Sequence, residues 1–162
     1  MRSAFTTFNN CLVNQLNNDV AVQYNGKIIQ VKALWDTGAT NSCISEDVVK
    51  ELSLVATGKI SMQTPSGEDI RNTYLVDVTL PNDVVISDLV VADSEIGAQN
   101  IGMLVGMDVI NRGDFAVSNY NNKTVFTFRI PSEKKTDYVT EIKVSNIIGP
   151  KHGKGKRKKN KK

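Results

Sequence analysis

The sequence predicts an all-β protein whose strands close on themselves as a barrel, with only one or two short helices. Apolar and polar residues alternate in short runs along most of residues 19–131, which is the period of a half-buried strand. Turn residues separate these runs, the clearest being Asn25-Gly26, a dipeptide that favours a tight hairpin. Short strands that follow one another without long helices are typical of a closed β structure rather than a βαβ sheet.

Two further hairpins and two short helices complete the expected order of elements. A long hairpin is expected to turn at Thr64, Pro65, Ser66, Gly67 and Glu68, where Pro precedes Ser-Gly. The last hairpin is expected to turn at Asn121-Asn122. Ser45 can cap a helix that runs through Leu52, and residues 107–112 fit a short helix closed by Gly113.

The two ends of the chain are less regular. Residues 1–18 form an N-terminal extension that fits a short helix or a frayed arm, because its apolar positions lie among many Thr and Asn residues. Residues 132–150 show a period-2 apolar pattern and are expected to be one more strand or a linker. Residues 151–162 are expected to be a disordered basic tail. The folded domain is therefore assigned to residues 19–131.

Charge is divided unevenly along the chain. The tail at 151–162 holds eight basic residues and no acid, which leaves 12 basic residues against all 17 acids in residues 1–150. The body therefore carries a net charge of about −5, which does not suit a nucleic-acid-binding domain. We expect any contact with nucleic acid or with an acidic partner to be weak and to involve the tail, which could equally be only a solvated end.

Other classes of protein do not fit the composition. No apolar run approaches the ~20 residues that span a bilayer, and no secretory signal is visible at the start. Cys11 and Cys43 have neither the spacing of a disulfide framework nor that of a metal site, and the sole histidine, His152, lies in the tail. We therefore expect a cytoplasmic protein without a metal, a cofactor or a membrane partner, and no Cys/His nucleophile.

The chemistry that the sequence predicts centres on Asp36-Thr37-Gly38-Ala39. Asp36 follows an apolar strand end, so its carboxylate would leave the strand where neighbours exclude water. Gly38 has no Cβ and lets a substrate main chain approach, while Ala39 keeps the adjoining wall small. Peptide hydrolysis by carboxylates needs two that share one proton, yet the sequence contains a single Asp-Thr-Gly. A second copy in a C2 homodimer would supply the other carboxylate.

This motif resembles the active-site motif of the retropepsins, a family of single-domain aspartic proteases. Later in the chain Leu104-Val105-Gly106 is similar to the apolar-apolar-Gly element that packs behind their catalytic loop. The hairpin around 64–68 lies where the family has its flap, and the similarity covers about residues 19–130. The resemblance implies a retropepsin-like acid-protease barrel that functions as a C2 homodimer.

The resemblance also implies a role for each matching residue. Asp36 would hold the nucleophilic water, Thr37 would bond across the dimer axis, and the Gly38 carbonyl would accept a hydrogen bond from the bound peptide. Leu104 would line a pocket for a side chain beside the scissile bond, although an ordinary core role fits it equally well. Val105 and Gly106 would support the catalytic loop from behind. The flap would close over an extended peptide through residues Thr64, Pro65, Ser66 and Gly67.

Three departures from the retroviral pattern are visible. Thr40 and Met107 stand where retroviral members have an acid and an arginine that pair, so both charges are absent together. The hairpin tip has Thr-Pro-Ser-Gly in place of a glycine-rich sequence. The chain also continues into an added hairpin, so its dimer interface is expected to differ.

Two hypotheses from different classes follow. The first is an aspartic endopeptidase in which water is activated between the two Asp36 carboxylates of a homodimer. The alternative is a non-catalytic retropepsin-like module for dimerisation or peptide binding, with a basic tail that binds polyanions.

Overall fold

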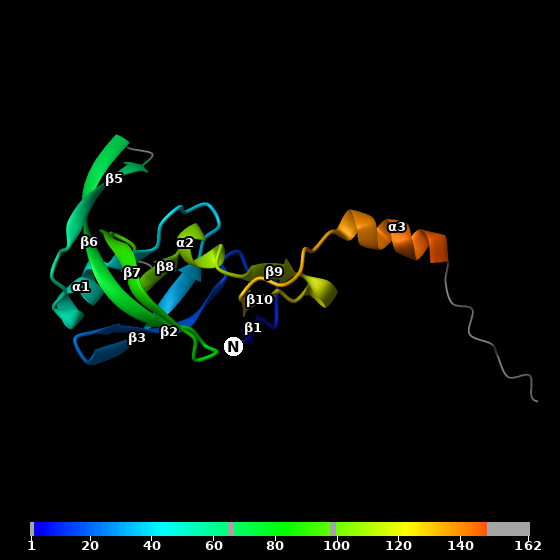
Figure 1. Ribbon diagram of the computed structural model, residues 1–162, viewed down its shortest axis with the longest axis horizontal. Coiled ribbons are helices and arrows are strands. Elements are labelled where there is room, and N and C mark those ends of the chain that lie inside the picture. The colour runs from blue at the N-terminus through cyan, green and yellow to red at the C-terminus, as the bar shows by residue number, and fades with distance from the viewer. Residues whose placement is uncertain (1, 65–66, 98–99, 149–162) are drawn as a thin grey trace, which may run out of the picture.

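A computed structural model describes residues 2–64, 67–97 and 100–148, and its strands form two sheets (Figure 1). The strands are β1 (Ser3–Phe8), β2 (Asn17–Tyr24), β3 (Lys27–Trp35), β4 (Cys43–Ser45), β5 (Gly58–Thr64), β6 (Gly67–Thr79), β7 (Val85–Ser94), β8 (Met103–Val105), β9 (Asp114–Ser118) and β10 (Val125–Ile130). The helices are α1 (Glu46–Leu52), α2 (Met107–Ile110) and α3 (Tyr138–Ile148), with a 3-10 turn at Tyr120–Asn122.

The larger sheet closes into a six-stranded barrel, as the sequence predicts. Its strand order is β2-β3-β8-β4-β7-β6, and β2 pairs with β6 to complete the ring. The closing pairs include Ala21 with Thr79 and Val22 with Val78. Inside lies one core of fully buried apolar side chains, among them Val20, Val22, Ile44, Leu80, Val91 and Met103. Closure leaves these six strands without a free edge over the paired residues, and β5 extends from β6 as a hairpin arm.

The turns and the first helix form where local sequence favours them. Asn25 and Gly26 join β2 to β3 with positive φ angles of 47° and 77°, which suits the turn of a two-residue hairpin. Asn121 and Asn122 also have positive φ angles, between β9 and β10. At the start of α1, the Ser45 hydroxyl accepts a hydrogen bond from the Val48 amide, so the predicted cap is present.

The smaller sheet has the order β1-β10-β9, and it corrects the prediction for the N-terminus. Residues 3–8 form a strand, neither a helix nor a frayed arm, because β10 offers a full antiparallel partner from Ser3↔Ile130 to Phe8↔Val125. Phe5 is buried against Phe126 and Phe128 of β10. The partner strand lies more than a hundred residues away in sequence, so local periodicity in residues 1–18 could not reveal the pairing.

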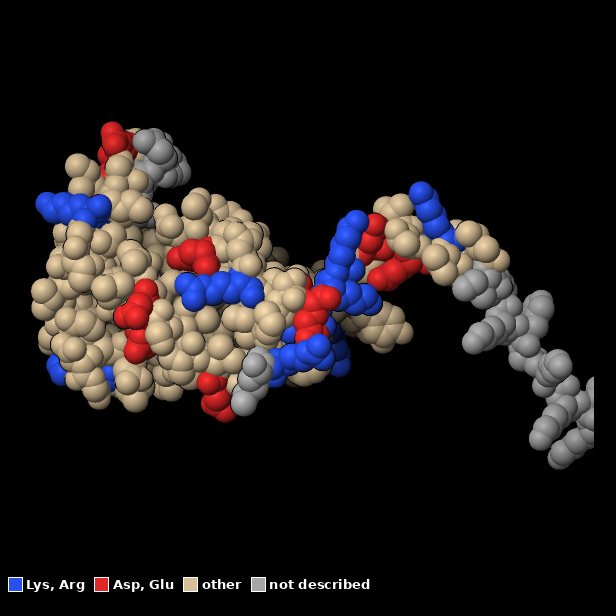
Figure 2. Space-filling view, in the orientation of Figure 1, with Lys and Arg blue, Asp and Glu red and all other residues tan. Residues whose placement is uncertain are grey.

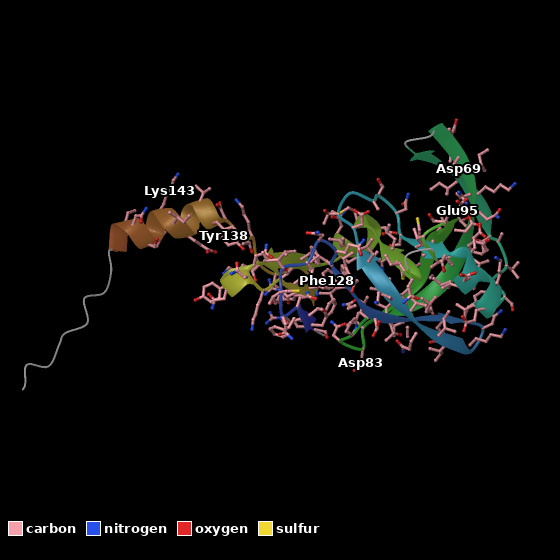
Figure 3. All side chains as sticks on the ribbon, turned by 180° about the vertical axis from the view of Figure 1, so that it is seen from behind. Asp69, Asp83, Glu95, Phe128, Tyr138 and Lys143 are labelled. Atoms are coloured by element: carbon pink, nitrogen blue, oxygen red, sulfur yellow. The ribbon has the colours of Figure 1, made fainter. Side chains whose placement is uncertain are left out.

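The C-terminal prediction needs a second correction. Residues 138–148 form α3 rather than a strand, and the Asp137 carboxylate accepts a hydrogen bond from the Thr140 amide at the start of the helix. This capping outweighs the period-2 pattern, because in the described residues no neighbouring strand pairs with the segment. Figure 3 shows Tyr138 and Lys143 on a helix that stands away from the body containing Phe128. The tail at 151–162 lies outside the described residues.

No helix in the described part of the chain is both long enough and apolar enough to span a bilayer.

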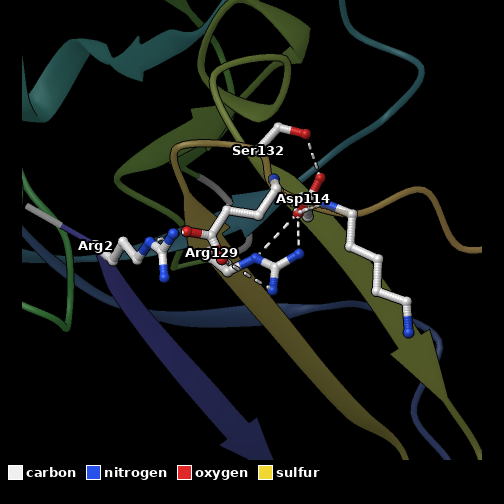
Figure 4. Close-up of polar contacts among 6 residues, drawn as sticks. Arg2, Asp114, Arg129 and Ser132 are labelled. Atoms are coloured by element: carbon white, nitrogen blue, oxygen red, sulfur yellow. Dashed lines mark hydrogen bonds and ion pairs between the residues drawn. The ribbon is translucent and has the colours of Figure 1, made fainter.

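A polar network fixes the path of the chain as it leaves β10 (Figure 4). The Asp114 carboxylate of β9 accepts hydrogen bonds from Arg129 Nε at 3.0 Å, the Glu133 amide at 2.9 Å and the Ser132 hydroxyl. Glu133 forms an ion pair with Arg2 beside β1. Figure 2 shows acidic and basic side chains gathered at this junction. The linker before α3 is therefore anchored to β9, to β10 and to Arg2, the residue directly before β1.

Replacement of Asp114 with Asn is expected to destabilise the smaller sheet in a pH-dependent way. Hydrogen bonds from Ser132, the Glu133 amide and Arg129 hold the pKa of Asp114 well below its ordinary value. A lowered folded-state pKa contributes stability that is complete above the unfolded pKa of about 3.9 and is lost as pH falls toward the folded value. Thermal unfolding should give the variant a lower Tm than the wild type at pH 7, and the gap should shrink below pH ~4. An equal gap at every pH would contradict this origin.

Candidate active site

The loop that follows β3 presents Asp36 to solvent on a tight turn. The Asp36 amide donates to the Val105 carbonyl at 3.0 Å, which continues the pairing of β3 with β8. The Gly38 amide donates to Asp36 Oδ1 at 2.8 Å, and the Ala39 amide donates to the Asp36 carbonyl at 3.2 Å. Asp36 is half-buried, whereas Thr37 and Gly38 are exposed. The loop therefore fixes the orientation of one carboxylate while leaving the surface of the turn open to a ligand.

The β8–α2 turn supports this loop from behind through close backbone contact. Val105 and Gly106 are buried. A Cβ built on Gly106 would lie 2.7 Å from the Asn41 carbonyl carbon and 3.0 Å from the Ala39 carbonyl oxygen. These distances are shorter than side-chain atoms tolerate, so only glycine allows the loop to approach this closely. The structure thus brings Val105 and Gly106 together with the motif at Asp36.

Hydrogen bonds occupy the place of the missing acid–arginine pair. The Met107 amide donates to the Ala39 carbonyl at 2.8 Å, and the Asp108 amide donates to the Thr40 carbonyl at 3.2 Å. The Asp108 carboxylate in turn accepts from both the amide and the hydroxyl of Ser42. Neither Asp108 nor Ser42 was among the site residues predicted from the sequence. The sequence signal that could have indicated this contact is the acidic residue Asp108 in the first turn of a helix that follows Gly106.

The strand that ends at Asp36 is held by aromatic packing. Trp35 is buried and stacks on Phe115 of β9, with ring centroids 5.4 Å apart and an angle of 4° between the planes. It also contacts Phe5, Phe126 and Phe128. Its indole nitrogen donates to the Asn18 side chain at 3.1 Å. Trp35 is therefore part of the core, and the smaller sheet thereby supports the residue directly before Asp36.

The predicted hairpin is present and projects from the barrel as β5 and β6 (Figure 1). Thr64 pairs with Gly67 at its end, whereas Pro65 and Ser66 lie outside the described residues. Arg71 donates to Asp69 and also to Glu95, which follows β7. Figure 3 shows Asp69 and Glu95 on neighbouring elements at this end of the barrel. Arg71 therefore ties the hairpin to the barrel wall.

A cavity of about 250 Å³ lies beside the base of the hairpin, next to the active-site loop and α2. Its lining mixes polar and apolar side chains, and the residues are Asn41, Ile60, Thr73, Asp88, Leu89, Val90, Ala92, Asp108 and Arg112. Leu104, for which the sequence left a substrate-pocket role and a core role equally open, does not line this cavity. It lies partly exposed on β8 between Leu34 and Cys43.

Cys43 lies close to the motif in sequence, and its side chain is buried. Burial raises the pKa of its thiol to about 11, and the nearby charges of Asp108 and Asp93 act in the same direction. The thiol is therefore protonated at neutral pH, and the thiolate is the reactive form. Among the residues that the structure describes, no group of three or more His, Cys, Asp or Glu side chains is arranged to hold a metal ion.

Comparison with known proteins identifies the fold. The family described as gag-polyprotein putative aspartyl protease matches residues 20–112, a segment that includes Asp36 and Asp108. No curated protein matches the chain. The crystal structure of a retropepsin-like aspartic protease from Rickettsia conorii is similar to this chain. The match covers 80% of this chain and 96% of the other, with a TM-score of 0.55 and 15% sequence identity. This likeness shows that the barrel has the retropepsin-like fold predicted from the motif.

Two further solved structures match with lower TM-scores. The EIAV protease complexed with the inhibitor HBY-793 is similar over 61% of this chain and 88% of its own, at 18% identity and a TM-score of 0.45. The retroviral protease-like domain of Ddi1 from Leishmania major is similar over 71% of this chain and 95% of its own, at 18% identity and a TM-score of 0.43.

The two cysteines are expected to differ sharply toward an alkylating reagent. Cys11 is exposed, whereas Cys43 is buried with a raised thiol pKa. Iodoacetamide at pH 8 should therefore label Cys11 in the folded protein and label Cys43 only after denaturation, as read by mass spectrometry of tryptic peptides. Equal labelling of both residues in the native protein would contradict the burial described for Cys43.

Proposed function

Because the chain belongs to the gag-polyprotein putative aspartyl protease family, we propose that it is an aspartic endopeptidase with Asp36 as its catalytic residue. The observation that carries the proposal is the Asp36 carboxylate itself, oriented by the Gly38 amide at the exposed end of a barrel strand. This position lies inside the matched segment of the chain.

The proposed reaction uses two Asp36 carboxylates, one from each chain of a homodimer. Two carboxyl groups that face each other at about 3 Å cannot both ionise, because like charges repel, so they share one proton. The ionised group takes a proton from water, whose oxygen forms a bond to the carbonyl carbon of the scissile peptide. The protonated group gives its proton to the peptide nitrogen, and the amine leaves as the C–N bond breaks. Thr37 and the Gly38 carbonyl contact the partner chain and the peptide, respectively.

The arrangement of elements supports a second copy facing the Asp36 loop. In Figure 1 the β5–β6 hairpin and the loop after β3 rise on the same, upper side of the molecule. β9 is an edge strand of the smaller sheet and is the uppermost of its three strands in this view. An edge strand offers unpaired backbone groups to another strand, and Val117 of β9 is an exposed apolar side chain. We infer that the two copies associate along β9.

The bound peptide is proposed to lie extended between the active-site loops and the β5–β6 hairpins. The hairpins would close over it through residues Thr64, Pro65, Ser66 and Gly67, excluding water and adding main-chain hydrogen bonds. Leu104 would flank the scissile bond from β8, where its side chain is partly exposed.

Replacement of Asp36 with Asn should remove hydrolysis and leave the fold intact. The amide cannot share a proton with the partner carboxylate, so kcat is expected to fall on the order of 10⁴-fold. Asp77→Asn is a matched control, since Asp77 accepts a hydrogen bond from Asp88 on the barrel wall. Cleavage of a mixed peptide library between pH ~4 and ~7 gives the readout, together with inhibition by a statine-type compound. Wild-type activity retained by Asp36→Asn would rule out the assignment.

Replacement of Val117 with Asp should weaken the dimer. Two new carboxylates near the symmetry axis would repel each other and would have to lose their hydration when β9 pairs. Sedimentation velocity should show a higher dimer dissociation constant, and activity should fall more steeply on dilution than in the wild type. Val85→Asp is the control, because Val85 is also an exposed apolar residue but lies on β7, outside the proposed β9 interface. An unchanged dimer in the Val117 variant would overturn the proposed interface.

A further inference from the structure

The loop that carries Asp36 has no regular secondary structure between β3 and β4, so its shape depends on contacts outside itself. At its first end, pairing of β3 with β8 fixes Trp35 and the Asp36 amide. At its second end, Ser42 directly precedes β4 and is fully buried. The exposed turn at 37–38 lies between these two anchors.

The carboxylate of Asp108 accepts two hydrogen bonds from Ser42, one on each oxygen. The Ser42 amide donates to Asp108 Oδ2 at 2.9 Å, and the Ser42 hydroxyl donates to Asp108 Oδ1 at 2.7 Å. The same hydroxyl oxygen accepts a hydrogen bond from the buried Gly106 amide at 3.0 Å. One serine therefore connects the active-site loop to both the side chain and the backbone of the β8–α2 turn.

The contact is reciprocal. The first amides of α2, those of Met107 and Asp108, donate to the carbonyls of Ala39 and Thr40. The loop thus supplies hydrogen-bond acceptors for the first amides of α2, which have no partner within the helix. In the opposite direction, Asp108 satisfies the amide and hydroxyl of Ser42. We call these five hydrogen bonds the Ser42–Asp108 clasp.

The clasp has the properties needed to hold a catalytic group still. Hydrogen bonds to an ionised carboxylate are shorter and stronger than neutral ones. The Ser42 hydroxyl has no water contact, so loss of its acceptor would leave a buried donor unsatisfied. The first end of the loop is fixed by the sheet, so the clasp removes the remaining freedom of the turn that orients the Asp36 carboxylate.

We propose that Ser42 and Asp108 are positioning residues, which hold the Asp36 loop in the geometry that hydrolysis requires. This inference rests on the proposed protease function. In retroviral members an acid and an arginine pair at the positions of Thr40 and Met107. In this chain, Ser42 and Asp108 would take over the role of holding the loop against the β8–α2 turn.

A direct role in substrate binding is the competing explanation, because Asp108 also lines the cavity beside the hairpin. The two roles differ in kinetics. Loss of a positioning residue misplaces the catalytic carboxylate and lowers kcat with KM unchanged. Loss of a substrate contact that is equal in ground and transition states raises KM with kcat unchanged.

The experiment compares Ser42→Ala, Asp108→Asn and the double variant with Ser45→Ala. Ser45 is the matched control, since it is also a buried serine but accepts a hydrogen bond from the Val48 amide at the start of α1. Each clasp variant is expected to lose about 10²-fold in kcat with KM unchanged. The double variant should lose little more than either single one, because the two side chains act as a unit. Ser45→Ala should keep its kcat even if its Tm falls.

Ser42→Cys provides a milder variant in case the others do not fold. It keeps the backbone contact and a weak donor, so its kcat should lie between those of the wild type and Ser42→Ala. Unchanged kcat in the folded variants, raised KM with unchanged kcat, or an equal loss in Ser45→Ala would each overturn the positioning role.

Amide hydrogen exchange separates failure of this inference from failure of the proposed function. The Gly38 and Ala39 amides should exchange faster in Asp108→Asn than in the wild type, whereas Ser45→Ala should leave them unchanged. A wild-type protein that cleaves no peptide would refute the protease assignment. In that case, equal exchange of these amides in the wild type and Asp108→Asn would also refute the clasp.

Discussion

Close backbone contact between the β8–α2 turn and the loop after β3 is the constraint on which the rest of the structure depends. Gly106 leaves no room for a side chain, so the loop can lie directly against the turn and exchange hydrogen bonds with α2. β8 can reach that position only because it pairs with β3 on one side and β4 on the other. Closure of the barrel and placement of the Asp36 loop are therefore consequences of the same short strand.

The smaller sheet extends this support from the opposite side. Its aromatic side chains surround Trp35, the last residue of β3, so the strand end that precedes Asp36 is held between two sheets. The polar network around Asp114 fixes the same sheet to the linker that leaves the domain. Packing and hydrogen bonds thus connect the N-terminal strand and the C-terminal hairpin with the loop after β3, and so connect the proposed β9 interface with Asp36, the proposed catalytic residue.

Much of the fold and the centre of the candidate site follow from short stretches of sequence. Asn25-Gly26 favours its hairpin because positive φ is a property of those two residues alone. Ser45 caps α1 through a hydroxyl three residues from its partner. The single Asp-Thr-Gly and the later Leu104-Val105-Gly106 predicted the retropepsin-like barrel, which the Rickettsia conorii structure resembles. Such patterns can be recognised because each is complete within a few residues.

The tertiary structure alone decided the features whose partners are far apart in the chain. β1 became a strand because β10 pairs with it, and a local reading favoured a helix or a frayed arm. α3 formed where alternation suggested a strand, since its cap is present and no described strand pairs with it. The Ser42–Asp108 contact joins residues 66 positions apart. Local sequence specifies the conformations that a segment favours, but only packing determines which distant group accepts a hydrogen bond from a buried donor. That choice shapes the loop that carries Asp36.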